Sequence, residues 1–336
     1  MKVLFIGGTG VISEACTWLA AERGIEMFLF NRGATQVPIP AGVKVINGDI
    51  HDVRAAAKAL KGRIFDCVVD WIAYEPEQVQ ADMKLFAGKT AQYIFISTAS
   101  VYQTPPTHYI VTEGTPASNP VWKYSQRKIE CEQRLMKAYR EKDFPVTIVR
   151  PSSTYSYRKM PGLIGCGGWS LIKRMMDMKK VIVHGDGTSI WTFTHNKDFA
   201  KGFIGLLGNI HAIGHTFHIT SDEVLTWNQI CQAMGAAVGV IPRIIHIPSD
   251  FINAMYPEIG EGFLGERSHS RVYDNSKIKN FVPGYAATIP FSEGVRECVS
   301  WFRTNPDQQI VNMEAEKKVD RIIAAYEKVF GKLSKS

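Results

Sequence analysis

The stretch Val3-Leu4-Phe5-Ile6-Gly7-Gly8-Thr9-Gly10 decides the fold, because it joins an apolar run to a glycine-rich turn. A short apolar run that ends in a turn is typical of a strand buried on both faces. A helical stretch follows from Ser13 to Arg23 and stops at Gly24. Glycines between a strand and a helix let backbone amides approach a pyrophosphate, and the helix dipole favours negative charge there. The segment therefore predicts a dinucleotide-binding turn, with Ser13 in place of the last glycine of the pattern.

Strands and helices continue to alternate through the first half of the chain. Such repeated units predict an α/β fold, in which a Rossmann-type doubly wound parallel sheet carries helices on both faces. The further expected strands are 27–30, 43–46, 67–69 and 93–96, and the further expected helices are 53–60 and 76–86.

The composition of the chain narrows the kind of protein that it can be. The chain has 336 residues, of which 45% are hydrophobic and 21% charged, as in a soluble globular protein. No secretory signal is visible and no apolar run reaches the roughly 18 to 20 residues that span a bilayer, so we expect a cytoplasmic protein without membrane contact. The six cysteines are scattered, which favours free thiols and no metal site. The net charge of +7 fits an anionic small substrate, a nucleic-acid surface or solubility alone.

Tyr124 and Lys128 are four residues apart and would leave the same face of a helix. A nearby ammonium stabilises a phenolate and brings the pKa of the tyrosine toward the working range of an acid/base catalyst. The pair is also common on ordinary amphipathic helices, where it has no chemical role. Thr98 strengthens the catalytic interpretation, because it follows an expected strand at the sheet edge where such folds bind ligands.

The end of the second strand bears on the choice of cofactor. An acidic residue there would bind the ribose hydroxyls of NAD, but this chain has Asn31 and Arg32. An arginine can hold the 2′-phosphate of NADP, so NADP is modestly favoured over NAD. The alternative is that Arg32 is a solvated turn residue.

Together these segments resemble the extended short-chain dehydrogenase/reductase family, the group of NAD-dependent epimerases and dehydratases. The resemblance covers nearly all of the chain. The matching motifs are Gly7-Gly8-Thr9-Gly10, Gly48-Asp49, the segment 97–102, Tyr124-x-x-x-Lys128, Arg150-Pro151, Phe193-x-His195-x-x-Asp198 and Asp274-Asn275-Ser276-Lys277.

The resemblance implies roles for particular residues. Tyr124 would be the catalytic acid/base, Thr98 would bind the substrate oxygen, and Lys128 would hold the nicotinamide ribose and lower the pKa of Tyr124. The other implied cofactor contacts are Gly7, Gly10, Val11, Ile12, Asn31, Arg32, Asp49, Ile50, Ile72 and Ala73. The implied substrate contacts are Tyr74, Ser100, Ser153, Trp191 and Arg267.

The resemblance also implies a smaller, mostly C-terminal substrate-binding lid. We expect residues 1–164 and 198–240 to form the dinucleotide-binding domain and residues 165–197 and 241–305 to form the lid. Residues 306–336 should be a C-terminal helix and tail.

Three departures from the family pattern affect the expected reaction. Ala99-Ser100 follow Thr98 where 4,6-dehydratases have an acidic pair, so a dehydratase ranks behind an epimerase or a dehydrogenase. Trp191 stands where nucleotide-sugar epimerases have a phosphate-binding arginine, and Ser153 replaces an asparagine. Arg267 or Arg271 could supply the missing charge, or both could be surface residues.

The sequence therefore predicts an NAD(P)-dependent epimerase or oxidoreductase acting on a sugar-like alcohol, with nucleotide sugars as one candidate class. The alternative is a non-catalytic NAD(P)-binding regulator or an RNA-binding protein of the same fold. We favour a small-molecule substrate over nucleic acid, and a homodimer stays open.

Overall fold

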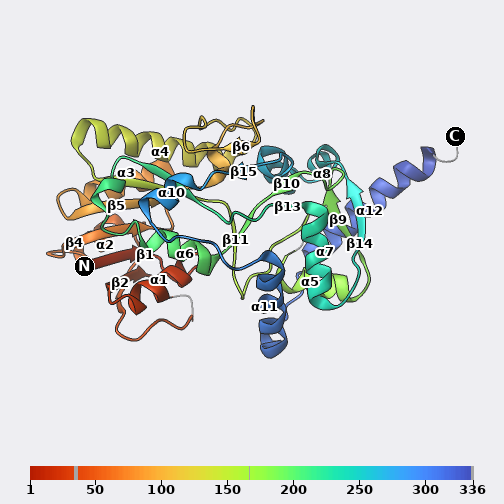
Figure 1. Cartoon of the computed structure of the whole chain (residues 1–336), viewed down its shortest axis with the longest axis horizontal. Helices are drawn as coiled ribbons and strands as arrows, with labels where there is room; N and C mark the ends of the chain where they lie inside the picture. Colours follow the sequence, from red (N-terminus) through yellow and green to blue (C-terminus); the bar gives the residue numbers. More distant parts are fainter. Residues whose placement is uncertain (34–36, 166, 334–336) are drawn as a thin grey trace.

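The computed structural model describes residues 1–33, 37–165 and 167–333, which form two lobes (Figure 1). The first lobe holds the N-terminal strands and their helices, and the second holds much of the C-terminal half. Cys166 and the last residues of the expected tail lie outside the described ranges. The predicted α/β class and its Rossmann-type doubly wound sheet are confirmed.

A seven-stranded sheet forms the centre of the first lobe, and all of its strand pairs are parallel. Its order is β12-β7-β5-β4-β1-β2-β3. The chain first adds β2 and β3 on one side of β1 and then crosses to the other side with β4, so the strand order reverses between β1 and β4. Open sheets of this kind bind ligands outside the carboxyl ends of the strands at such a reversal. The strands are β1 (Lys2–Ile6), β2 (Glu26–Asn31), β3 (Lys44–Asn47), β4 (Phe65–Asp70), β5 (Thr90–Ile96), β7 (Val146–Pro151) and β12 (Thr216–Ile219).

Helices cover both faces of this sheet, which is why residues 3–6 of β1 are completely buried. One face packs against α1 (Ser13–Glu22), α6 (Asn196–Ile204) and α10 (Ser276–Phe281). The opposite face packs against α2 (Val53–Ala59), α3 (Pro76–Phe86) and α4 (Lys123–Lys142). The expected strands and helices of the first half are present, with ends that differ by three residues at most.

The second lobe encloses a separate hydrophobic core. Its main helices are α5 (Gly168–Met176), α7 (Trp227–Val238), α8 (Ser249–Met255), α11 (Phe291–Thr304) and α12 (Met313–Leu333), beside the parallel pair β9 (Lys180–His184) and β14 (Arg243–Ile247). Shorter elements are η1 (Ala99–Val101), β6 (Ile110–Val111), β8 (Ser153–Tyr155), β10 (Ile190–Trp191), β11 (Phe193–His195), η2 (Ile210–Ala212), β13 (Leu225–Thr226), α9 (Pro257–Gly262), η3 (Phe263–Arg267), β15 (Val272–Tyr273) and η4 (Pro306–Gln308). Within the described ranges, the helices are too short or too polar to cross a bilayer.

The packing differs from the predicted division of the chain in two places. Helix α7 falls in the range 198–240 assigned to the nucleotide domain, yet its Trp227 and Ile230 pack in the core of the second lobe. Ile278 falls in the range 241–305 assigned to the lid, yet it packs in the core of the first lobe. The C-terminal helix α12 packs on the second lobe, where Ile322 contributes to the core. An apolar stripe shows that a helix face is buried, but it does not show against which lobe.

Candidate active site

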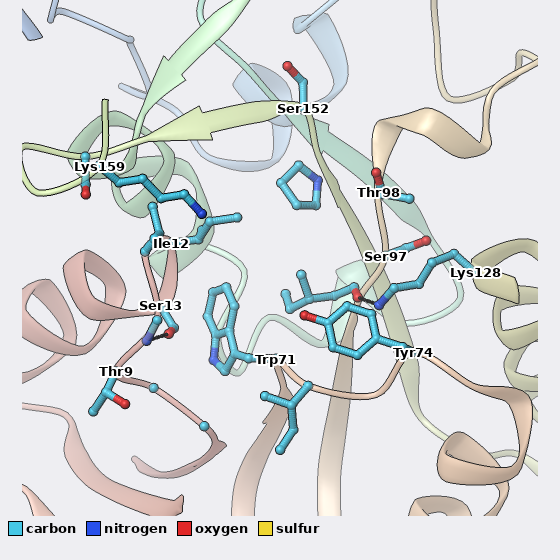
Figure 2. A pocket seen from close by; sticks show the side chains of 18 of the residues that line it. Thr9, Ile12, Ser13, Trp71, Tyr74, Ser97, Thr98, Lys128, Ser152 and Lys159 are labelled. Atoms are coloured by element: carbon cyan, nitrogen blue, oxygen red, sulfur yellow. Dashed lines mark hydrogen bonds between the residues drawn. The ribbon is translucent and has the colours of Figure 1, made fainter. Parts of the chain in front are cut away.

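A cavity of about 710 Å³ opens at the carboxyl ends of the central strands (Figure 2). It extends from the glycine-rich turn to the predicted catalytic residues and is lined by both apolar and basic side chains. The lining residues are Gly7, Gly8, Thr9, Gly10, Val11, Ile12, Ser13, Val37, Trp71, Ile72, Tyr74, Ile96, Ser97, Thr98, Tyr124, Lys128, Pro151, Ser152, Ser156, Arg158 and Lys159.

The turn after β1 has the conformation that the sequence predicts. Gly7 and Gly8 have φ angles of +96° and +106°, which favour glycine. A Cβ atom on Gly8 would lie only 2.6 Å from Leu29 Cδ2, so the chain also needs a small residue here. Ser13, which replaces the last glycine of the pattern, accepts a hydrogen bond from the Gly10 amide at 2.9 Å. The turn is therefore tight, and α1 begins directly beside the cavity.

A second cavity of about 310 Å³ continues from the first and shares Gly7, Thr9, Ile72 and Tyr74 with it. Asn31, Arg32, Asp49 and Ile50 line this part, as expected for an adenosine pocket. Arg32 Nη1 lies 3.9 Å from Asp49 Oδ2, and both side chains are largely exposed.

Gly48 lines the second cavity and packs directly against Phe30, because a Cβ atom there would lie 2.4 Å from Phe30 Cζ. The two cavities together offer a long cleft with a glycine turn at its middle, and this shape fits an extended dinucleotide.

Lys128 is 2% exposed and joins two walls of the site. Its ammonium donates hydrogen bonds to the carbonyls of Ala73, at 2.6 Å, and Ile96, at 2.8 Å. It also lies 4.5 Å from the centre of the Tyr74 ring. Burial lowers the pKa of Lys128 to about 8, and the charge of Asp70 opposes this shift. The lysine therefore fixes the loop after β4 against the end of β5.

The carboxyl group of Asp70, at the end of β4, binds the backbone of that loop. Its Oδ1 accepts hydrogen bonds from the amides of Ile72, at 2.7 Å, and Ala73, at 3.0 Å. The same carboxyl group, through Oδ2, accepts a hydrogen bond from the Tyr93 hydroxyl at 3.3 Å. Asp70 therefore links the loop that carries the Ala73 carbonyl to Tyr93 in the interior of the first lobe.

Tyr124 and Thr98 line the same cavity. The ring of Tyr124 lies between those of Trp122 and Tyr74, with centroid distances of 5.0 and 6.2 Å. Thr98 Oγ1 lies 3.1 Å from Ser100 Oγ, which accepts a hydrogen bond from Ser125. A threonine and a tyrosine hydroxyl thus face one space, in which a substrate oxygen could contact both.

The expected effect of Lys128 on Tyr124 is not what the structure shows. Burial raises the pKa of Tyr124, the neighbouring Tyr74 raises it further, and the Thr98 hydroxyl opposes the shift. The ammonium of Lys128 is instead bound to two carbonyls. This arrangement of side chains therefore favours the protonated phenol of Tyr124 over the phenolate.

The remaining substrate contacts expected from the resemblance divide into two groups. Tyr74 lines both cavities, and Ser100 supports Thr98 from behind. Ser153 instead lies in β8, opposite Phe193 of β11.

Two of the expected contacts, Trp191 and Arg267, lie elsewhere and correct the prediction. Trp191 is fully buried in the second core, with its ring 5.7 Å from that of Trp227. The guanidinium of Arg267 lies 5.3 Å from the ring of Phe263, and its carbonyl accepts a hydrogen bond from Trp227 Nε1. Both residues are thus engaged in packing. The alternative source of charge, Arg271, is also completely buried.

Ser152, Ser156, Arg158 and Lys159 line the cavity but were missed by the sequence analysis. They follow the Arg150-Pro151 motif directly, so their proximity to a strand end was the signal that could have found them.

The described residues contain no group of side chains suited to hold a metal ion, and their cysteines are free and buried.

The fold is of the Rossmann type, and the paired cavities have a shape that fits a dinucleotide. Residues 85–220 match the model of the NAD dependent epimerase/dehydratase family. This match and the shared fold confirm the predicted resemblance to extended short-chain dehydrogenases/reductases.

Two curated relatives are each 26% identical to this chain. The first is the chloroplast stem-loop binding protein of 41 kDa b of Arabidopsis thaliana, aligned over 74% of this chain and 67% of its own length. The second is a dTDP-glucose 4,6-dehydratase of Actinoplanes, aligned over 64% of this chain and 61% of its own length. Other 4,6-dehydratases also match.

Among solved structures, the UDP-glucose 4-epimerase of Bifidobacterium longum in complex with NAD⁺ and UDP has a similar fold. The TM-score is 0.74 at 18% identity, and the match covers 92% of this chain and all of the epimerase. The family match and the relatives support an NAD-dependent enzyme of the epimerase/dehydratase type.

Proposed function

We propose that the protein is an NAD(P)-dependent epimerase or oxidoreductase that acts on a sugar-like alcohol, with nucleotide sugars as the first class to test. The observation that carries this proposal is the single cavity that joins the glycine turn to Thr98, Tyr124 and Lys128. A protein that only sensed the cofactor would not need two hydroxyl groups facing a substrate-sized space beside it.

The residues have separable tasks in this proposal. Thr98 and Tyr124 would hold the reacting hydroxyl or carbonyl oxygen, and Tyr124 would give or take its proton. Lys128 would bind the ribose nearest the reacting carbon while it keeps the loop after β4 in place. Bound NAD or NADP would supply the acceptor and donor of hydride. Trp71 and Ile72 would exclude water from the middle of the cavity.

The protonated state of Tyr124 suits one direction of this chemistry. A neutral phenol can donate its proton to a carbonyl oxygen as that carbonyl is reduced. Oxidation of an alcohol needs the phenolate, so we propose that it begins only once cofactor and substrate have changed the surroundings of Tyr124. The charge of Lys128 is available for this change at neutral pH, because its pKa is about 8.

The choice between epimerase and dehydratase rests on the residues after Thr98. Dehydratases are prominent among the relatives, but Ala99 and Ser100 offer no carboxyl group for elimination of water. We therefore favour epimerisation, or simple oxidation and reduction, over elimination of water. Product analysis with UDP-glucose, UDP-glucuronic acid and dTDP-glucose would decide, since a product that has lost water would establish a dehydratase.

Substitution of Tyr124 by phenylalanine tests the proposed mechanism. We expect Tyr124→Phe to lower turnover of an active substrate by about 100-fold or more, the usual contribution of a positioned acid/base. Its affinity for NAD should stay within about twofold of wild type. Tyr109→Phe is the matched control, because Tyr109 is 53% exposed and lies outside both cavities. Unchanged turnover in Tyr124→Phe would refute the assigned role.

A stem-loop RNA-binding protein is the second candidate, and the name of the Arabidopsis relative favours it. The net charge of +7 is compatible with it. A gel shift with a stem-loop RNA at increasing salt would test this function, since contacts to phosphates weaken steeply as salt rises. Absence of binding at low salt would dismiss it, and binding that Tyr124→Phe leaves intact would support a role separate from catalysis.

A further inference from the structure

The segment that follows β8 forms a tight turn over the glycine-rich turn of β1. Ser156 and Lys159 form an isolated bridge, and the Lys159 amide donates a hydrogen bond to the Ser156 carbonyl at 3.0 Å. Ser156, Arg158 and Lys159 line the main cavity together with residues 7–13. Two segments more than 140 residues apart in the sequence therefore face each other across the same space.

An ion pair fastens this turn to α1. Arg158 Nη2 donates a short hydrogen bond to Glu14 Oε2, and the Tyr157 hydroxyl donates one to Glu14 Oε1 at 3.2 Å. Glu14 is 5% exposed and lies in the first turn of α1. Its negative charge would disfavour an anion at this helix end, but Arg158 compensates it. The turn at 156–159 is thus held at a fixed place relative to the start of α1.

Lys159 adds a further positive charge to this turn. Among the described residues it has no ion-pair partner, and its side chain is exposed. Figure 2 shows its ammonium entering from the side of Ile12 and Ser13, away from Thr98 and Lys128. The described side chains around the cavity include three bases and no carboxylate. The free charge therefore lies at the end of the cavity formed by the start of α1.

We propose that residues 156–159 are a clasp that closes over the diphosphate of the bound dinucleotide, with Lys159 as the residue that binds the phosphate oxygens. The glycine turn and the first amides of α1 would contact the diphosphate from one side, and Lys159 from the other. Arg158 would act as a positioning residue, because its pair with Glu14 places the turn. This inference rests on the proposed cofactor, but not on the proposed reaction.

The test measures binding without turnover. NAD, ADP-ribose, adenosine and UDP would be titrated by calorimetry or by displacement of NAD from wild type, Lys159→Gln and Lys159→Arg. We expect Lys159→Gln to weaken NAD and ADP-ribose by about 5- to 20-fold, since it removes one charge-assisted contact at a partly exposed site. Adenosine, which lacks phosphate, should keep its affinity. Lys159→Arg should retain most of the binding.

A control variant and a salt series distinguish a specific contact of Lys159 from a general effect of positive charge. Lys317→Gln removes an exposed lysine on α12, far from the cavity in sequence and outside its lining, and should leave all affinities unchanged. Added salt should weaken NAD binding less in Lys159→Gln than in wild type, because the screened contact is gone.

Two results would overturn the clasp. Unchanged affinities of Lys159→Gln for NAD and ADP-ribose would show that Lys159 does not bind the diphosphate. A loss confined to UDP would assign the charge to the substrate instead. Neither result would touch the proposed chemistry of Tyr124, whereas a wild-type protein that binds neither NAD nor NADP would refute both proposals.

Discussion

Lys128 shows how one buried side chain can be structural and functional at once. Its ammonium donates hydrogen bonds to the carbonyls of Ala73 and Ile96 and so holds the loop after β4 against the end of β5. A buried lysine is costly, because its charge has lost contact with water. The hydrogen bonds and the charge of Asp70 offset only part of that cost, which is why its pKa falls to about 8.

The lowered pKa makes stability depend on pH in a defined direction. Since the folded-state pKa of Lys128 lies below the ordinary 10.5, the unfolded chain binds the extra proton between about pH 8 and 10.5. Wild type should therefore gain stability relative to Lys128→Met as pH rises through this window, by about 1 to 3 kcal/mol. Urea unfolding at pH 7, 8, 9 and 10 measures the difference. A gap between the two proteins that stays constant over this range would contradict the lowered pKa.

At the scale of elements, a buried acid cluster connects α3, β4 and β5. The Tyr93 hydroxyl donates a hydrogen bond to Asp82 Oδ2 at 2.8 Å and lies 3.3 Å from Asp70 Oδ2. Asp70 and Asp82 are 1% and 3% exposed. Burial raises the pKa of Asp82, and the nearby Asp70 raises it further. Through Asp70 the cluster also binds the loop after β4, which Lys128 holds from the other side. The buried acids therefore help to position a loop beside the cavity.

Asp82→Asn tests this cluster. A carboxyl whose folded-state pKa is raised stabilises the protein fully at low pH, and this contribution is lost as pH rises above the ordinary value of 3.8. Wild type should therefore lose stability over that rise by up to about 1.4 kcal/mol per pH unit, and Asp82→Asn should not. Denaturant unfolding from pH 4 to pH 8 would show it, with the exposed Asp307→Asn as the control. A uniform destabilisation of Asp82→Asn at every pH would argue against the raised pKa.

The sequence predicted the features that depend on neighbouring residues, and it did not predict those that depend on contacts between distant segments. Strand β1, its glycine turn and α1 form by local rules. Thr98 was recognised at a strand end and Tyr124 with Lys128 by their spacing on one helix, and all three line the cavity. Trp191 was placed by alignment with a family arginine, but an indole fits a hydrophobic core and lies against Trp227. Lys159 lines the cavity next to Arg158, whose pairing with Glu14 is a contact between distant segments that no local pattern records.

At the scale of the whole molecule, the two lobes have separate hydrophobic cores. The second core is closed by α12, where Val319, Ile322 and Ile323 pack among the residues of α5, α7 and α11. Arg174 of α5 also donates hydrogen bonds to Glu316, at 2.8 Å, and Asp320, at 2.7 Å. The glycine turn and Lys128 instead belong to the first lobe, whose two cores contain no residue of α12.

This division predicts that damage to the second core lowers stability without abolishing cofactor binding. Ile322 is fully buried, so Ile322→Ala should lower the free energy of unfolding by about 2 to 5 kcal/mol. Below the unfolding transition, its affinity for NAD should stay within about twofold of wild type. The exposed Lys317→Ala, on the same helix, should change neither quantity. Thermal unfolding and NAD titration of the three proteins measure both effects. A loss of NAD affinity that parallels the loss of stability would show instead that the two lobes fold and bind as one unit.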